Sequence, residues 1–157
     1  MKASHFSPDT WELIGLFQTH GVKYVVVGGE AVIHYGHARL TGDVDFFYGT
    51  ELENTERLFS ALLEFWGGDV PSVDTARDLA TPDQVLQFGR PPNRIDLLTQ
   101  ISGVSFDEAW DSRQTLIADD GTPVFMISRP LLLRNKEASG RPKDLDDAAF
   151  LRATGQP

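Results

Sequence analysis

The sequence predicts an α/β domain: a mixed β-sheet with helices mainly on one of its faces. The first observation is length, since 157 residues fit one domain, which buries roughly 68–70% of its unfolded surface on folding. The second is that short β-branched and aromatic runs alternate with longer segments whose apolar residues recur at helical spacing. The third is that no internal repeat, low-complexity tract or long linker divides the chain. We therefore expect one domain over residues 1–157.

The N-terminal segment carries the signature of a helix start. Ser7 can cap the helix, Pro8 suits its first position, and Asp9 complements the helix dipole. Apolar residues then recur on one face as far as Gly21, a residue type that commonly ends helices.

The next elements alternate between strand and helix. Residues 23–27 (KYVVV) form a continuous β-branched and aromatic run that is too short for a helix, which predicts a buried strand. A short helix is expected over residues 30–35, a second strand over 43–48, and a helix with a clear apolar face over 52–66.

The C-terminal half predicts two hairpins and two helices. The first hairpin joins residues 85–88 to 95–98 through the polar connection GRPPN. The second joins 116–118 to 124–127 through Asp119-Asp120-Gly121. Residues 130–152 predict two short helices interrupted by SGRP.

Composition excludes several classes of function. Fourteen lysine and arginine residues against 23 aspartate and glutamate residues give a net charge of −9, the opposite of the basic surface of a duplex-binding protein. The absence of cysteine excludes disulfides, thiolate zinc sites and a cysteine nucleophile. No G-x-S-x-G, H-E-x-x-H or Walker A sequence occurs. Pro8 and Asp9 interrupt the N-terminal apolar residues, so we expect neither a signal peptide nor a membrane anchor, and a cytoplasmic location.

The segment VGGEAVIHYGHARLTGDVDFFY carries the chemical signal. It places Gly28-Gly29 between a strand and a short helix, and then Asp43 and Asp45 on the next strand. Residues two apart on a strand share a face and lie roughly 6.6 Å apart, so the two carboxylates need a cation between them. Magnesium binds carboxylate and phosphate oxygens, while a glycine turn before a helix lets phosphate approach the backbone. Each feature alone is commonly a turn or a solvated strand edge, whereas the combination favours a metal–nucleotide site.

The string GGEAVIHYGHARLTGDVD resembles the signature of the DNA polymerase β-like nucleotidyltransferases. Its R-x-T-x-D-x-D form, residues 39–45, is similar to that of the AbiEii-like and related small bacterial nucleotidyltransferases, some of which are toxins of toxin–antitoxin pairs. The chain departs from the family pattern at Gly29, where many members have a serine that contacts phosphate.

The resemblance implies a nucleotidyltransferase fold and a set of site residues. It implies that a third carboxylate on a neighbouring strand completes the Mg²⁺ site, and Asp96 is the best match. The alternative role for Asp96 is a strand-end carboxylate paired with Arg94. The resemblance assigns the catalytic and metal-binding roles to Asp43, Asp45 and Asp96, and nucleotide binding to Gly28, Gly29, Arg39, Thr41 and Lys136.

The segment KEASGRPKDLDD, residues 136–147, resembles the K…R-x-K-D-x-x-D element that closes the site in the AbiEii-like group. By this resemblance Lys136 reaches the triphosphate, and Arg141, Lys143, Asp144 and Asp147 position the triphosphate or its acceptor. The alternative for a lysine in a helical tail is a solvated position.

The function that follows from the resemblance is Mg²⁺-dependent transfer of a nucleoside monophosphate from an NTP to an acceptor hydroxyl. The acceptor stays open between tRNA, a protein and a small molecule, and an antitoxin or other partner protein is possible in a toxin–antitoxin pair. The acidic composition favours a protein or a cationic small molecule over long RNA. The alternative is a catalytically silent module that binds a nucleotide or a partner protein.

Overall fold

The computed structural model describes residues 6–155 and contains one six-stranded sheet. The strands are β1 (Tyr24–Val27), β2 (Asp43–Tyr48), β3 (Val85–Phe88), β4 (Arg94–Leu98), β5 (Gln114–Ile117) and β6 (Pro123–Met126). The α-helices are α1 (Pro8–His20), α2 (Gly28–His34), α3 (Leu52–Trp66), α4 (Phe106–Asp111), α5 (Arg129–Ser139) and α6 (Pro142–Ala153). A 3₁₀-helix, η2, spans Ala76–Ala80.

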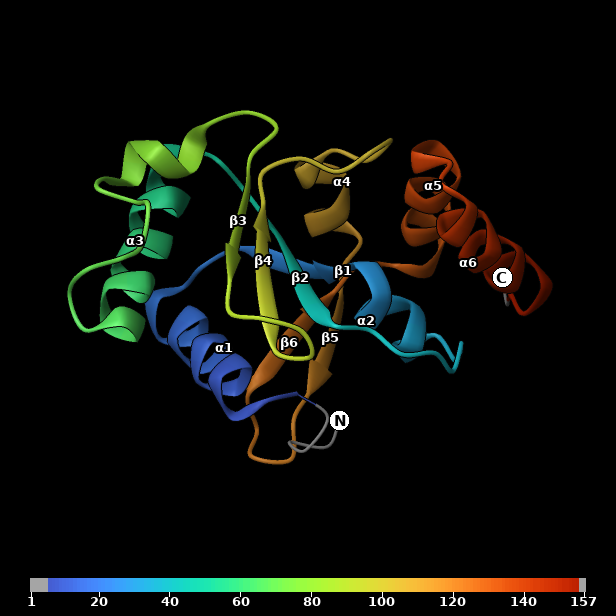
Figure 1. Ribbon diagram of the computed structural model, residues 1–157, viewed down its shortest axis with the longest axis horizontal. Coiled ribbons are helices and arrows are strands. Elements are labelled where there is room, and N and C mark those ends of the chain that lie inside the picture. Colours follow the sequence, from blue (N-terminus) through green and yellow to red (C-terminus); the bar gives the residue numbers. More distant parts are fainter. Residues whose placement is uncertain (1–5, 156–157) are drawn as a thin grey trace.

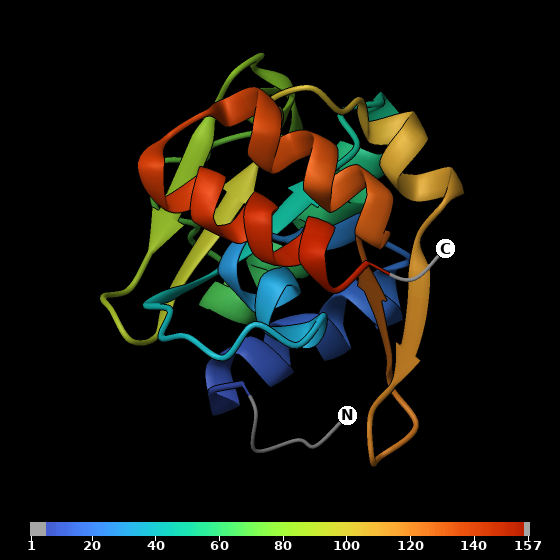
Figure 2. The same cartoon turned by 90° about the vertical axis from the view of Figure 1, so that its right-hand side faces the viewer.

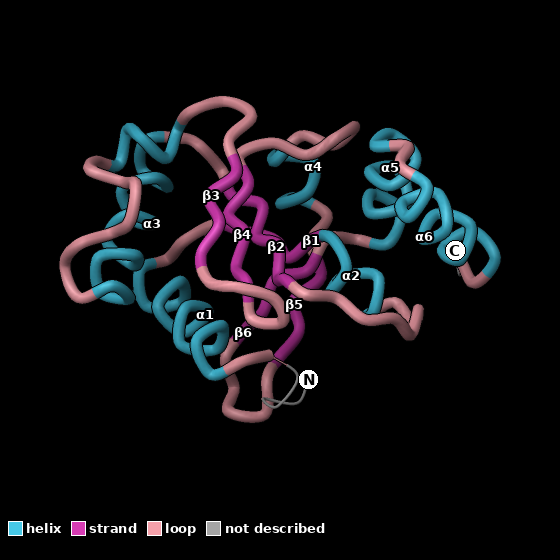
Figure 3. The backbone as a smooth tube through the Cα atoms, in the orientation of Figure 1, coloured by secondary structure: helices cyan, strands magenta, loops and turns pink. Residues whose placement is uncertain are grey.

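The sheet is mixed and open, which confirms the predicted fold class. Its strand order is β3-β4-β2-β1-β6-β5, and Figure 3 shows it as the centre of the molecule. β2 pairs in parallel with β4 and antiparallel with β1, and β1 pairs in parallel with β6. Each edge is an antiparallel hairpin, β3–β4 on one side and β5–β6 on the other, as the turn residues predict.

One face of the sheet packs against α1 and α3. Phe17 of α1 lies edge-on to Phe46 of β2, with ring centroids 5.4 Å apart, and tilts against Tyr24 of β1 at 5.1 Å. Residues 46 and 48 of β2 point to this face because side chains alternate along a strand. Tyr48 is fully buried there, and its hydroxyl donates to the Leu79 carbonyl of η2 at 2.8 Å. This face therefore holds a large part of the aromatic core.

The other face carries the odd-numbered residues of β2 and is bordered by shorter helices. Figure 1 shows the sheet nearly edge-on between α1 and α3 on one side and α2, α5 and α6 on the other. Figure 2 shows α5 and α6 lying side by side across this second side. The expectation of helices mainly on one face holds for the two longest helices, α1 and α3. Shorter helices border the opposite face, which carries the carboxylates.

The predicted elements correspond closely to those observed. α3 and β3 have the predicted bounds, and α1 begins at Pro8 after the Ser7 cap and ends at Gly21 in the left-handed conformation. α2 begins two residues earlier than expected, at Gly28. α4 and η2 were not predicted, and their brevity explains why. Within residues 6–155, none of the helices is both long and apolar enough to span a bilayer.

Candidate metal and nucleotide site

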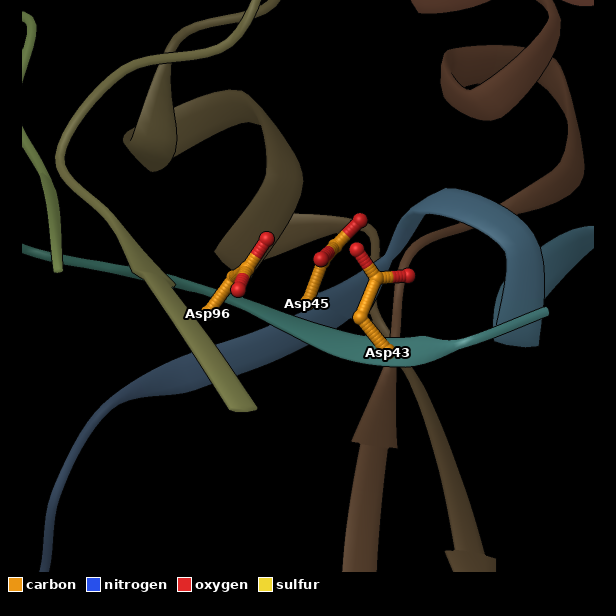
Figure 4. Close-up of side chains that lie close together, drawn as sticks. All are labelled: Asp43, Asp45 and Asp96. Carbon is orange, nitrogen blue, oxygen red and sulfur yellow. The ribbon is translucent and has the colours of Figure 1, made fainter. Parts of the chain in front are cut away.

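Three aspartates from two adjacent parallel strands meet on the face opposite α1. Asp43 and Asp45 lie on β2, and Asp96 lies on β4 directly across from Asp45 in the strand register. One carboxylate oxygen from each residue lies within 4.8 Å of the other two. Figure 4 shows the three side chains converging from the two strands. The alternation of side chains along β2 and the register of β2 with β4 together produce the cluster.

Asp45 is the most confined of the three carboxylates. Its Oδ1 atom is buried and has no hydrogen-bond partner among the described residues. Burial, together with the negative charges of Asp43 and Asp96, raises the pKa of Asp45 well above its usual range. Such an oxygen is under-satisfied as the protein stands, and a cation that shares it with Asp43 and Asp96 would relieve both the burial and the repulsion.

Gly28 makes room for the Asp45 carboxylate. A Cβ on residue 28 would lie 2.1 Å from Asp45 Oδ2, and Gly28 also has a φ of +68°, a conformation that side-chain-bearing residues rarely adopt. The prediction that Gly28 binds phosphate stays a prediction. The structure shows in addition that Gly28 lies against the Asp45 carboxylate.

Gly29 has a comparable relation to Thr41. The Thr41 Oγ1 atom lies 2.7 Å from the position that a Cβ of residue 29 would take, and an Arg39 nitrogen lies 3.1 Å from that position. The Thr41 hydroxyl is also 3.2 Å from Asp43 Oδ1, to which it donates. The Thr41 hydroxyl thus lies beside Gly29, the position at which the sequence lacks a serine.

Arg94 lies among the carboxylates as their cationic partner. Its guanidinium bonds Asp43 Oδ2 at 2.6 Å and both oxygens of Asp96, at 3.0 and 3.2 Å. Burial raises the pKa of Asp96, and the Arg94 hydrogen bonds and charge offset only part of this effect. The two roles considered for Asp96, third carboxylate of the cluster and partner of Arg94, are therefore both present in one geometry.

The predicted cations of the site form a second, buried network. Lys136 on α5 is 5% exposed, and its Nζ lies 3.2 Å from both Asp144 and Asp147 of α6. Asp147 also pairs with Arg39, with Nε 3.1 Å from Oδ1. A solvated position for Lys136 is therefore wrong. The Asp147 carboxylate of α6 contacts both Lys136 of α5 and Arg39 in the loop that precedes β2.

Asp144 of this network has a lowered pKa. Burial raises its pKa, but hydrogen bonds from Arg141 and Ser139 and the contact with Lys136 outweigh burial and lower the pKa to about 2. Arg141 Nε lies 2.7 Å from Asp144 Oδ2, and Ser139 Oγ donates to the same oxygen at 2.8 Å. Asp144 thus bonds to Lys136, Ser139 and Arg141 and does not belong to the cluster of three carboxylates.

Both groups of charges line one cleft of about 740 Å³. Every predicted site residue lies along it: Gly28, Gly29, Arg39, Thr41, Asp43, Asp45, Asp96 and Lys136. Arg141, Lys143 and Asp144 also line it, whereas Val85, Gln87, Leu98, Ile101 and Ser102 form a largely uncharged portion. Asp147 lies behind the cations rather than in the lining. The cleft therefore offers a carboxylate cluster, a cationic portion and an uncharged portion.

The donor set fits a hard divalent cation. The carboxylates of Asp43, Asp45 and Asp96 supply only oxygen, and Asp45 Oδ1 is buried with no hydrogen-bond partner in the part of the chain that the structure describes. Magnesium takes oxygen ligands at octahedral positions and completes its shell with water and substrate phosphates. A cluster of three carboxylates beside a cationic cleft matches that requirement, and a zinc site built on imidazole or thiolate does not.

Sequence reasoning missed two contacts that hold this site together. The bridge from Arg94 to Asp43 joins residues 51 positions apart, and that from Arg39 to Asp147 joins residues 108 positions apart. Arg94 was considered only as a partner of Asp96. The signal that would have revealed its second contact is the parallel register of β2 and β4, which pairs Asp43 with Arg94.

No protein-family model matches this chain, and no match to it is found among curated proteins.

Proposed function

We propose that the protein is a Mg²⁺-dependent nucleotidyltransferase that moves a nucleoside monophosphate from an NTP to an acceptor hydroxyl and releases pyrophosphate. The observation that carries the proposal is that a cluster of carboxylates and a group of cations lie in the same cleft. Three carboxylates meet within 4.8 Å, and the buried Lys136 lies along the same cleft with Arg39 and Arg141. A metal–triphosphate complex presents the complementary pattern, a cation beside a run of anionic oxygens.

Five of the charged residues at the site have a role in this proposal, as do Asp147 behind them and Gly28. Asp43, Asp45 and Asp96 would hold Mg²⁺, which when bound neutralises phosphate charge and polarises the acceptor hydroxyl. Lys136 and Arg39 would attract the triphosphate while Asp147 holds both cations in place. Gly28 would keep the Asp45 carboxylate at the cleft. Asp96 would accept the proton of the acceptor hydroxyl.

The acceptor would lie over the uncharged portion of the cleft, next to Asp96. Gln87 of β3 pairs in register with Asp96, so its side chain lies on the same face of the sheet. Val85 on the same strand is 48% exposed. We place the acceptor, a protein, a tRNA or a small molecule, on this side of the carboxylates. A partner protein such as an antitoxin would act by covering the cleft.

The binding part of the proposal is tested by calorimetry with each NTP, with Mg²⁺ and with EDTA. We expect binding that needs Mg²⁺ and is lost in the double variant Asp43→Ala with Asp45→Ala, because the triphosphate and the carboxylates repel without a cation. Equal affinity in both buffers would contradict the metal site.

The catalytic part is tested with Asp96→Asn. Asparagine keeps the shape of the side chain but is a weaker ligand and no base, so transfer should fall by about two orders of magnitude or more. Nucleotide affinity should change little, and the metal-free melting temperature should hold or rise because burial already raises the pKa of Asp96. NTP binding without transfer of label to any acceptor in a cell extract would instead identify a catalytically silent nucleotide-binding module.

A further inference from the structure

Arg94 occupies oxygens that the proposed metal site needs. Its guanidinium contacts one oxygen of Asp43 and both oxygens of Asp96, so two of the three carboxylates are bound to it. Within residues 6–155, Asp45 Oδ1 is buried and has no hydrogen-bond partner, Arg94 included. The positive charge that compensates the cluster is therefore a side chain of the chain itself, held on one flank of the cluster.

Arg94 and a divalent cation would compete for the same negative charges, those of the Asp43 and Asp96 carboxylates. A carboxylate has lone pairs for more than one partner, so geometry alone does not forbid both at Asp96. Electrostatics opposes it, because a guanidinium and a divalent cation bound to one carboxylate lie within a few ångströms of each other and repel. An arginine side chain stays charged in proteins, so Arg94 cannot relieve this repulsion by losing a proton. One of the two cations must withdraw.

Arg94 has room to withdraw. Its side chain is 30% exposed and lines the main cleft. It also lines a second, smaller cavity of about 150 Å³ beside Pro92 and Asn93. The residue lies at the first position of β4, next to the turn that ends the β3–β4 hairpin. A rotation about the side-chain bonds, with no movement of β4, takes the guanidinium away from Asp96 into either space.

We infer that Arg94 is an internal counter-cation that keeps the carboxylate cluster intact without metal and must leave Asp43 and Asp96 when a divalent cation binds. Arg94 thereby lowers the affinity of the free protein for metal. It also couples metal binding to nucleotide, since the anionic triphosphate in the same cleft gives the released guanidinium a new partner. The inference rests on the proposed function, because it assumes that the three aspartates are the metal ligands.

Metal binding without nucleotide tests the inference directly. Mn²⁺ serves as the probe, because the electron paramagnetic resonance signal of free Mn²⁺ reports how much is bound. We compare the wild type with Arg94→Gln, which removes the charge, and Arg94→Lys, which keeps it. The matched control is Arg57→Gln, which removes an arginine charge from an exposed pair with Glu53 on α3.

We expect Arg94→Gln to bind Mn²⁺ about tenfold more tightly or better, and to melt at a lower temperature without metal, because three like charges then lack their counter-cation. Arg94→Lys and Arg57→Gln should bind Mn²⁺ nearly as the wild type does. Equal or weaker binding by Arg94→Gln overturns the inference while leaving the metal site in place. If neither the wild type nor Arg94→Gln binds Mn²⁺, the metal site and the inference both fail.

A second measurement uses the wild-type protein and so does not depend on the folding of a variant. The Nε–H proton of Arg94 donates to Asp96 and should exchange slowly with water in ¹⁵N-arginine spectra, where Arg94→Lys identifies the signal. Addition of Mg²⁺ with α,β-methylene-ATP should shift this signal and make its exchange fast. An unchanged, slowly exchanging signal in the presence of bound nucleotide overturns the inference.

Discussion

Gly28 is the residue at which backbone conformation and site geometry are both restricted. Its φ of +68° favours glycine, and a Cβ there would collide with Asp45 Oδ2. Gly28→Ala should therefore cost about 1–2 kcal/mol for the left-handed backbone and also displace the carboxylate. We expect at least about tenfold weaker Mg²⁺-dependent NTP binding, a loss of about 1.4 kcal/mol or more, measured by calorimetry beside urea unfolding.

Gly67→Ala is the matched control for this prediction. Gly67 ends α3 with a φ of +71°, and no atom lies within 4 Å of the position of its Cβ. Both variants should lose similar backbone stability, and only Gly28→Ala should lose affinity for the metal–nucleotide complex. Equal losses of affinity in the two variants would show that Gly28 does not act through Asp45.

Asp144 makes the stability of the protein depend on acidic pH. Its pKa is lowered to about 2 in the folded protein from an ordinary value of 3.8, so the folded state binds the proton less tightly than the unfolded state. The stabilisation, about 2 kcal/mol, is complete above the unfolded pKa and is lost as the pH falls from about 4 to about 2. Asp144→Asn lacks this contribution.

Urea unfolding of the wild type and Asp144→Asn between about pH 6 and about pH 2 measures the stabilisation that ionised Asp144 provides. We expect the wild type to be more stable by about 2 kcal/mol at the upper end and the difference to shrink toward zero at the lower end. A difference that stays constant over this range would mean that shape rather than charge makes Asp144 important.

Asp43 and Asp45 could be predicted because their signal is local, since D-x-D on a strand fixes two carboxylates to one face. Asp96 was identified by the resemblance, and the structure pairs it in register with Asp45. The environment of each could not be predicted. Gly28 was assigned to phosphate because a glycine turn before a helix commonly serves that purpose, whereas its close contact with Asp45 depends on how β1 and β2 pair.

At the scale of elements, the α5–α6 hairpin is fastened to the loop before β2 by one side chain. Asp147 of α6 contacts Arg39 of that loop and Lys136 of α5, and its side chain is 1% exposed. Asp147→Asn should lower the free energy of unfolding by about 2 kcal/mol or more, because it removes a charge from a buried pair with two cations. It should also speed hydrogen exchange at the amides of residues 36–42 and weaken NTP binding.

Asp146→Asn makes the same chemical change on the preceding residue of α6, which is exposed. It should leave stability, exchange and NTP binding close to those of the wild type. If Asp147→Asn is as mild as Asp146→Asn, the hairpin is held by apolar packing, with Leu132 and Leu151 as the buried candidates.

Element prediction succeeded where the periodicity was long or the turn signal was strong. α3 has 15 residues, enough for its apolar face to recur over several turns, and its bounds are as predicted. α4 and η2 have six and five residues, too few for a helical period to emerge. The Ser105–Glu108 capping box was the available signal for α4, since each side chain bonds the other's backbone nitrogen.

At the scale of the whole molecule, sequence predicted a mixed sheet but not its strand order. The hairpins β3–β4 and β5–β6 follow from short turns, which local chemistry specifies. The parallel pairings of β2 with β4 and of β1 with β6 join strands far apart in the chain, and each needs a long crossover connection. The site is placed by the first of these pairings, so its cluster geometry required the structure.

The distribution of charge over the molecule favours an acceptor other than long RNA. The net charge is −9, and the cleft cations Arg39, Arg94, Lys136 and Arg141 are each paired with an aspartate. A triphosphate bound with Mg²⁺ needs only a local group of cations, whereas a polynucleotide track needs many unpaired ones. The uncharged portion of the cleft, with Val85, Leu98 and Ile101, adds no basic residue.

Labelled NTP, Mg²⁺ and cell extract therefore test the acceptor class. We expect the transferred label to be recovered with protein or with small molecules and to survive ribonuclease. The rate of transfer should fall only modestly between about 50 mM and about 200 mM salt, whereas an acceptor held by six to ten phosphate contacts loses about 10³–10⁵ in affinity over that range. Asp43→Ala with Asp45→Ala provides the blank, because it lacks two of the three proposed metal ligands. Label that ribonuclease releases, and whose formation falls steeply with salt, would show that RNA is the acceptor and that the exposed cleft residues Arg141 and Lys143 guide it despite the net negative charge of the protein.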